Sequence, residues 1–341
     1  MPEPKFHRKI TWFNFICCLM VIWTHSGNAD LFFPELGQDA PWWHFQYPVM
    51  QEILRVDIPC FIMLSAYLFY RNFTMKRLGE KLNKRLHSLL VPYLLWNTIY
   101  YVAYVAASRI PGLQTIANRM DLVITTSGAW QAITKYTFNP VFWFMYQIIL
   151  LVLLAPVLYL FLKNIWTGAA FLLVLFVALF KGVALPELNL DALIYYSFAA
   201  YAALHGRKWA EAVWSRKRAA LGVCLLAVGI VLSRSYYTHY FVPGIVLYQL
   251  LAVIGIWMMV NERWLGEVRP FMTCTFFIYA THFVVVRFLN KAAALLFPGS
   301  QLVSMFMYVC MPLLAVTLCY QAARVLRRYR PDIWKTLNGG R

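Results

Sequence analysis

Long uncharged apolar runs, separated by short polar or basic segments, dominate the pattern along the chain. A helix that crosses a bilayer needs about 20 mostly apolar residues. Ten segments fit this description: 10–27, 48–70, 87–107, 141–162, 166–184, 191–205, 219–235, 243–261, 270–289 and 301–323. Neither a fixed-period repeat nor a soluble segment interrupts the series. The pattern therefore predicts an all-α fold, a polytopic membrane helical bundle of about ten transmembrane helices, with residues 1–341 as a single domain.

The composition supports a membrane protein and excludes several other classes. The 341 residues are 61% hydrophobic and 13% charged, whereas soluble domains run near 45–50% apolar and about 25% charged. This excess excludes a disordered protein, a secreted disulfide scaffold and a soluble dehydrogenase-like enzyme. The seven cysteines show no CxxC motif and no zinc-like spacing to histidine, so we expect no metal site.

The distribution of basic residues predicts the orientation. The net charge is +17, but the basic residues cluster between the apolar runs, which indicates membrane topology and no nucleic-acid partner. With the N-terminus inside, 23 of the 31 Lys and Arg residues fall in inside segments and five fall outside. We therefore expect a multi-pass protein of the cell membrane with both termini in the cytoplasm. The first apolar run lacks a small-residue cleavage site, so it is interpreted as a retained span.

Polar side chains inside the spans indicate where the chemistry lies, because ionisable residues in a bilayer usually face the bundle interior or a wet cavity. His25 lies about 15 residues into the first span, or about 22 Å from its inner end. In the predicted orientation several spans place polar or aromatic polar residues in the outer half of the bundle: His25, Glu52, Arg55, Asp57, Trp143, Tyr146 and His282. A basic group, Lys81, Lys84 and Arg85, precedes the third span on the inner side. This arrangement predicts an anionic cytosolic ligand and an outward-facing reaction site, in an enzyme or a transporter.

Five short motifs follow one another along the chain. They are Trp12-Phe-Asn14-Phe to Trp23-Thr-His25-Ser; Arg55-Val-Asp57-Ile-Pro to Ser65-Ala66-Tyr67; Lys84-Arg85-Leu-His-Ser88 to Pro92-Tyr93; Phe142-Trp143-Phe-Met-Tyr146; and Ile278-Tyr279-Ala-Thr-His282. In these motifs the sequence resembles the acyltransferase family 3 membrane proteins, which modify cell-surface glycans and related acceptors. It departs from the family pattern where Asn14 replaces a basic residue, Ala66 replaces a glycine and Ser88 replaces a second arginine.

The resemblance implies a transmembrane acyltransferase, and we expect an O-acetyltransferase. The enzyme would use acetyl-CoA or another acyl-CoA as donor and would need no metal. The acceptor would be a hydroxyl of a cell-surface glycan or a related molecule, and membrane lipids would surround the protein. His25 would act as general base and Asp57 would fix its tautomer. Lys84 and Arg85 would bind the phosphates of CoA. Asn14, Arg55, Trp143, Tyr146 and His282 would line the substrate site.

Each of these residues also has a structural interpretation. Lys84 and Arg85 would suit the positive-inside pattern or lipid headgroups, and Asp57 could form an ion pair with Arg55 or Arg287. Aromatic residues at 143 and 146 could be interfacial anchors, and either histidine could serve helix packing. A transporter or flippase for a polar solute or glycan is the alternative function, and a non-catalytic scaffold is the third.

Overall fold

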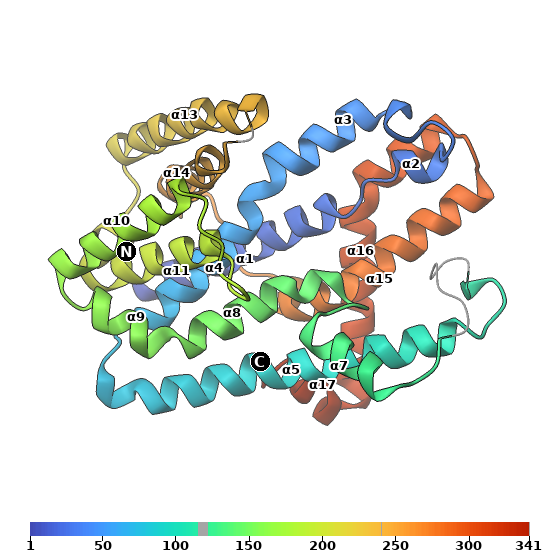
Figure 1. Cartoon of the computed structure of the whole chain (residues 1–341), viewed down its shortest axis with the longest axis horizontal. Helices are drawn as coiled ribbons and strands as arrows, with labels where there is room; N and C mark the ends of the chain where they lie inside the picture. The colour runs from blue at the N-terminus through green and yellow to red at the C-terminus, as the bar shows by residue number, and fades with distance from the viewer. Residues whose placement is uncertain (115–121, 240, 341) are drawn as a thin grey trace. The chain divides into compact units, whose positions relative to one another are not determined.

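The computed structural model describes residues 1–114, 122–239 and 241–340 (Figure 1). Every regular element among these residues is a helix, which confirms the predicted all-α membrane class. The helices form two compact units, each assembled from three parts of the chain. Unit 1 contains Met1–Cys17, Val56–Asn83 and Gln147–Met272, and unit 2 contains Cys18–Arg55, Lys84–Tyr146 and Thr273–Arg341. Each unit is described by itself.

Helices occupy all ten predicted span positions, but not all are long enough to cross a bilayer. In the described part of the chain, seven segments qualify by length and composition: Glu3–Phe32, Trp43–Tyr70, Met75–Ala107, Arg216–His239, Val242–Met259, Pro270–Leu296 and Gln301–Tyr329. Pro140–Leu153 and Ala155–Leu162 form a pair bent by 59°, which gives an eighth if counted as one span. The remaining two, α10 (Ile165–Phe180) and α11 (Leu190–His205), have 16 residues each. Such helices are about 24 Å long.

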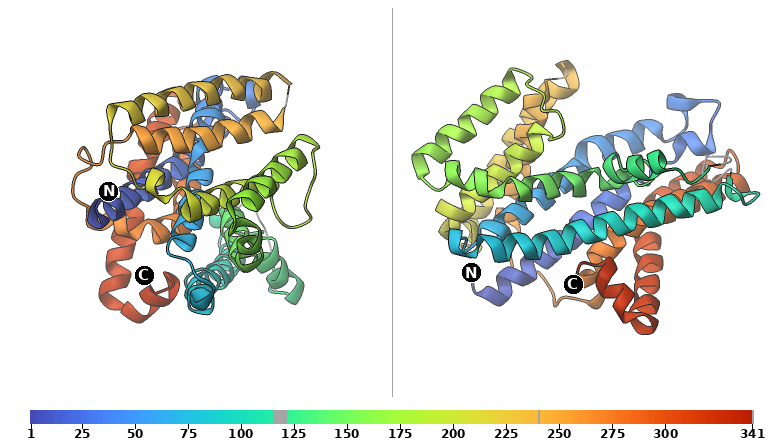
Figure 2. Two further views of the ribbon diagram at one scale, coloured as in Figure 1. Left: turned by 90° about the vertical axis from the view of Figure 1, so that its left-hand side faces the viewer. Right: turned by 60° about the horizontal axis from the view of Figure 1, so that its bottom comes forward.

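Unit 1 is built mainly from the first part of α1 (Glu3–Thr24), α4 (Asp57–Tyr70), α9 (Ala155–Leu162), α10, α11, α13 (Arg216–His239) and α14 (Val242–Met259). Helices α13 and α14 lie side by side (Figure 2). Gly222 and Gly255 allow this approach, because a Cβ on Gly222 would lie 2.6 Å from the Gly255 carbonyl oxygen. Helix α11 packs on α4 through small residues, of which Ala199, Ala200 and Ala203 are buried.

An ion-pair cluster ties the chain's N-terminus to the end of α4 in unit 1. Arg71, whose side chain is 8% exposed, lies 2.5 Å from a Glu3 oxygen and 2.7 Å from a Glu211 oxygen. Hydrogen bonds to Glu3 and Glu211 raise the pKa of Arg71. Burial opposes ionisation of Glu211, yet hydrogen bonds from Arg71 and Tyr67 leave its pKa lowered. Short elements complete this region: η4 (Met75–Arg77) and α12 (Arg207–Ala210).

Unit 2 contains the end of α1, α2 (Ala29–Phe32), η1 (Gly37–Asp39), α3 (Trp43–Pro48), most of α5 (Leu78–Ala107), α7 (Thr126–Thr134), η5 (Pro140–Phe142), the start of α8 (Trp143–Leu153), α15 (Thr275–Leu296), α16 (Gln301–Tyr329) and α17 (Pro331–Leu337). Helices α15 and α16 pack on each other, and α17 turns back beside α16 (Figure 2). The short turn η6 (Pro270–Cys274) leads from unit 1 into α15.

The beginning of the second predicted span differs from a regular helix. Helix α3 ends at Pro48, and a π-helical turn, η2 (Val49–Ile53), and a 3₁₀ turn, η3 (Leu54–Val56), follow before α4 begins. Glu52 and Arg55 therefore lie in irregular turns at the start of the predicted span 48–70, which falls within the candidate membrane span Trp43–Tyr70. Proline residues at 48 and 59 each lack a backbone N–H, which weakens the regular hydrogen-bond ladder on both sides of this stretch. Short π-helical turns are frequent at functional sites.

Candidate functional site

Unit 2 brings together His25 and His282, two of the predicted site residues. His25 directly follows α1, and its backbone N–H contacts the carbonyl oxygens of Val21 and Ile22 at 3.3 and 3.1 Å. His282 lies in α15 and is 0% exposed. The two imidazole centroids are 5.6 Å apart with an interplanar angle of 40°. The ring of Phe283 packs edge-on against His25 at 5.4 Å, so the histidine pair has an apolar wall on one side.

The orientation of His282 is fixed by its own helix. Its Nδ1 atom lies 2.6 Å from the carbonyl oxygen of Tyr279. Because a carbonyl oxygen only accepts, Nδ1 carries the hydrogen, and in the neutral ring Nε2 carries the lone pair. Nε2 is buried and has no hydrogen-bond partner among the described residues. An unsatisfied buried acceptor is costly, so this atom is suited to receive a hydrogen bond from a substrate or from a ring that moves on binding.

Aromatic residues connect this pair to the start of α8. The ring of Tyr279 lies 6.0 Å from that of His282 and stacks on Phe142 at 5.6 Å. Its hydroxyl donates to the Val141 carbonyl oxygen at 2.5 Å. Phe144 packs edge-on against Tyr279 at 5.9 Å and also contacts the neighbouring Trp143 at 6.5 Å. Trp143 thus belongs to an aromatic chain that reaches the histidines.

Tyr146, the other predicted aromatic site residue, contacts different rings. Its ring lies 6.3 Å from Tyr93 of α5 and 6.1 Å from Tyr136. The Tyr93 hydroxyl donates to the Ile133 carbonyl oxygen of α7 at 2.5 Å. Tyr146 therefore lies beside the contact between α5 and α7 (Thr126–Thr134).

A buried network of amides holds the turn that follows His25. The side chain of Asn28 donates to Asn290 Oδ1 at 3.2 Å and to the Ser304 carbonyl oxygen at 3.1 Å. Its Oδ1 accepts from Gln46 Nε2 and Ser304 Oγ, both at 3.0 Å. Asn290 in turn donates to the Ser26 carbonyl oxygen at 3.1 Å. The network joins α3, α15 and α16 to the residues directly after His25, so it restricts the position of the imidazole.

The predicted donor-binding residues lie in the first third of α5, in the same unit. Lys84 is exposed and Arg85 is half-buried. Further along the helix, the Tyr100 hydroxyl donates to the Ala280 carbonyl oxygen at 2.8 Å, two residues before His282. Fifteen residues separate Arg85 from Tyr100, which is about 22 Å along a helix. A ligand that joins the two regions of unit 2 must therefore be elongated.

The remaining predicted site residues are distributed between the units. Asn14 and Asp57 belong to unit 1 and Arg55 to unit 2. Asp57 is buried at the first residue of α4, where its Oδ1 accepts the Ile58 N–H at 2.6 Å. A carboxylate at a helix N-terminus is favourable, so at this position Asp57 can stabilise the start of α4. Its predicted action on His25 stays a prediction. Within the described ranges, no cluster of three or more His, Cys, Asp or Glu side chains could hold a metal ion.

The fold and the site thus define a membrane-embedded helical protein whose described polar centre is an imidazole pair with one unsatisfied acceptor. The chain belongs to the acyltransferase 3 family: the family model, described as an acyltransferase domain, matches residues 8–324. It is 24% identical to the succinoglycan biosynthesis protein ExoH of Rhizobium meliloti (strain 1021), in a match that covers 94% of this chain and 89% of ExoH. No solved structure matches the chain. The protein is therefore a membrane transferase with an acyltransferase domain.

Proposed function

We propose that this protein transfers an acyl group, most simply acetyl, from cytosolic acyl-CoA to a hydroxyl of a cell-surface polysaccharide. The family match supports acyl transfer, and the name of ExoH associates that relative with the biosynthesis of a polysaccharide, succinoglycan. The observation that carries the proposal is the histidine pair of unit 2, with rings 5.6 Å apart and one buried nitrogen acceptor. A hydroxyl that attacks a thioester needs such a base.

In the proposed reaction, His25 removes the proton from the acceptor hydroxyl as the oxygen attacks the thioester carbonyl carbon. The tetrahedral intermediate collapses with cleavage of the C–S bond, and the imidazolium returns the proton to the CoA thiolate. His282 is a positioning residue, whose Nε2 accepts a hydrogen bond that aligns the reacting groups. Histidine suits both proton transfers because its pKa in water lies near neutrality.

The donor is proposed to bind through the basic residues of α5. Arg85 presents a planar guanidinium that can form two parallel hydrogen bonds to a phosphate, and Lys84 supplies a point charge. The roughly 22 Å of α5 between this end and Tyr100 suits the long flexible arm of CoA. The excess of basic residues in the segments assigned inside supports a cell-membrane protein with both termini in the cytoplasm.

The direct test is acyl transfer in membranes with radiolabelled acetyl-CoA and the host's surface polysaccharide, with expression matched by immunoblot. His25→Ala should lower transfer by roughly 10²–10⁴-fold, the range for a lost general base. His44→Ala is the matched control, because His44 is exposed in the same unit. Near-normal transfer by His25→Ala would mean that another residue is the general base. A wild-type protein that moves solute into vesicles and never consumes acyl-CoA would favour a transporter.

A further inference from the structure

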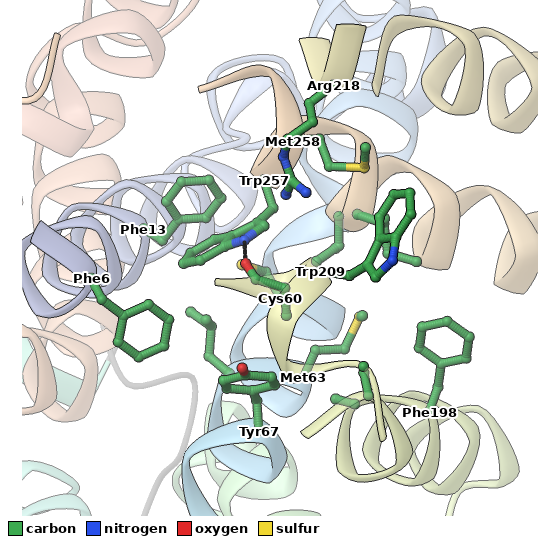
Figure 3. A pocket seen from close by; sticks show the side chains of 17 residues that line it. Phe6, Phe13, Cys60, Met63, Tyr67, Phe198, Trp209, Arg218, Trp257 and Met258 are labelled. Carbon is green, nitrogen blue, oxygen red and sulfur yellow. Dashed lines mark hydrogen bonds between the residues drawn. The ribbon is translucent and has the colours of Figure 1, made fainter. Parts of the chain in front are cut away.

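Unit 1 contains a cavity of about 260 Å³ that the acyl-transfer proposal does not use (Figure 3). Helices α1, α4, α11, α13 and α14 and the short α12 all contribute to its wall. Its lining residues include Phe13, Met63, Tyr67, Trp209, Arg218 and Trp257. Every lining residue belongs to unit 1.

The wall of this cavity is suited to hydrocarbon. Aromatic, aliphatic and sulfur-containing side chains form most of it, and two polar groups in the wall already have partners. The Trp257 indole N–H donates to the Ala210 carbonyl oxygen at 2.8 Å, and the Tyr67 hydroxyl donates to Glu211 at 2.9 Å. Water is poorly retained in an apolar cavity, because it needs two to four polar partners.

The volume fits part of a fatty-acyl chain. A water molecule occupies about 30 Å³ of liquid, and a methylene group is of similar size, so the cavity has room for roughly nine such groups. Protein interiors are otherwise close-packed, with few voids larger than a water molecule. If the cavity stayed empty, its lining atoms would lose dispersion contacts. An acyl chain restores these contacts and removes its own apolar surface from water.

Arg218 gives the cavity a charged end. Figure 3 shows its guanidinium group at the edge of the cavity, between Trp257 and Trp209. In the described part of the chain, this group makes no salt bridge and donates no hydrogen bond. The backbone N–H of Arg218 donates to Ser215 Oγ at 3.3 Å. Trp209 is 68% exposed, so the cavity reaches the surface near α12.

Further basic residues are neighbours in the chain of residues that line this cavity. Arg216 and Lys217 precede Arg218 in the first turn of α13, and Lys208 lies in α12. Glu262, an opposite charge that attracts Arg218, also accepts the Trp214 N–H at 3.3 Å. A guanidinium group beside an apolar cavity is complementary to a molecule with a hydrocarbon chain and an anionic phosphate.

We propose that this cavity binds one acyl chain of an anionic phospholipid, with the lipid phosphate at Arg218. The lipid would fill the space among α4, α11 and α14 and stabilise unit 1. This inference does not depend on acyl transfer, because it uses no residue of the histidine pair or of the proposed donor site.

The experiment uses the full-length protein in lipid nanodiscs with phosphatidylglycerol that carries a photoreactive diazirine in one acyl chain. The matching phosphatidylcholine probe is the headgroup comparison. After irradiation, peptide mapping should place the phosphatidylglycerol adducts on cavity-lining residues of α11 and α14. Labelling there should exceed that by phosphatidylcholine at least threefold. Equal labelling by both probes would refute the assignment of the phosphate to Arg218.

Two variants separate the cavity from its charge. Ala202→Phe places a ring in the cavity and should lower labelling at least fivefold, whereas Val231→Phe on the exposed face of α13 should not. Arg218→Gln leaves the cavity open and should remove the preference for phosphatidylglycerol, whereas Arg216→Gln should retain it. If gel filtration shows that the Ala202→Phe variant does not fold, the labelling of the Arg218→Gln variant alone tests the proposal. Unchanged labelling in the folded variants would overturn the proposal, as would stronger competition by palmitoyl-CoA than by phosphatidylglycerol.

Discussion

Substitutions of His282 can distinguish a positioning role from that of a base. Asparagine places its amide near the position of Nδ1, and glutamine places its amide near that of Nε2. His282→Asn can retain the hydrogen bond to the Tyr279 carbonyl oxygen, which is 2.6 Å long in the wild type, but removes the Nε2 acceptor. His282→Gln can place a carbonyl oxygen where Nε2 lay, while the Tyr279 oxygen loses its donor. The two variants therefore separate the two nitrogens of one ring.

The expected magnitude follows from the buried acceptor. A buried hydrogen-bonding group without its partner costs about 1–3 kcal/mol, and about 1.4 kcal/mol in the barrier corresponds to a tenfold change in rate. If Nε2 only accepts a hydrogen bond in the transition state, His282→Asn should lower kcat roughly 5- to 150-fold. His282→Gln should recover part of that loss. If His282 were instead the base, neither amide could take the proton, and both variants should lose about 10²–10⁴-fold.

The assay is the initial rate of acetyl transfer from radiolabelled acetyl-CoA in membranes with matched expression. KM for the donor is measured alongside kcat, because a positioning role should mainly affect kcat. A pH profile adds a second readout, since a positioning residue should leave the pH dependence set by His25 in place. Wild-type rates in His282→Asn would refute the reasoning, because the unsatisfied Nε2 atom would then have no function in the reaction.

Three further predictions concern the amide network of unit 2, the ion-pair cluster of unit 1 and the proposed donor site. Asn28→Ala removes four buried side-chain hydrogen bonds and should destabilise the protein by about 3 kcal/mol or more, seen as a lower midpoint of unfolding in dodecyl sulfate; an unchanged midpoint would contradict this network. Glu211→Gln should cost about 1.5–3 kcal/mol at pH 7, because hydrogen bonds to charged groups are lost. The pKa of Glu211 is lowered from its ordinary value of 4.5. The stabilisation by the Glu211 carboxylate is therefore complete above pH 4.5 and is lost as the pH falls below it, so the free energies of unfolding of the variant and the wild type should converge in acid. The double variant Lys84→Ala/Arg85→Ala should raise the donor KM at low salt and reduce the salt dependence of that KM. The control double variant Lys76→Ala/Arg77→Ala should do neither. Equal effects of the two double variants would mean that both pairs serve only the membrane orientation of the protein.

The helix positions could be predicted from the sequence because each apolar run must satisfy its backbone groups internally in a bilayer. The irregular backbone could not be predicted in the same way. Over 141–162 the apolar run is continuous, yet the structure bends by 59° at Leu154. Pro156 lies in the first turn of α9, where its missing N–H costs little, so a new helix begins there. Hydropathy averages over such a break.

The site was predictable only in part, for a physical reason. The depths of His25 and His282 follow from residue counts along two spans, and the structure places the two rings together in unit 2. The hydrogen bond from His282 Nδ1 to the Tyr279 carbonyl oxygen and the lack of a partner for Nε2 among the described residues depend on the rotamer of His282. Residue spacing does not determine this rotamer. The prediction of the site considered ionisable and aromatic side chains in the spans, so it did not include the neutral amides around Asn28. A clustering of Asn and Gln at the ends of apolar runs was the available signal.

Ser88 of α5, which follows the proposed donor-binding residues by about one helical turn, contacts the C-terminal segment of unit 2. The residues after α17 pack on α5 at this position: a Cβ built on Gly339 would lie 2.5 Å from the Ser88 carbonyl oxygen, and Gly339 has φ +63°. Glycine is therefore required there by both the backbone conformation and the contact. The Trp96 indole N–H holds the same segment through the Leu337 carbonyl oxygen at 3.1 Å. Residues 331–341 lie beyond the part matched by the family model, 8–324. In this chain, a C-terminal segment thus packs on α5 about one helical turn beyond Lys84 and Arg85.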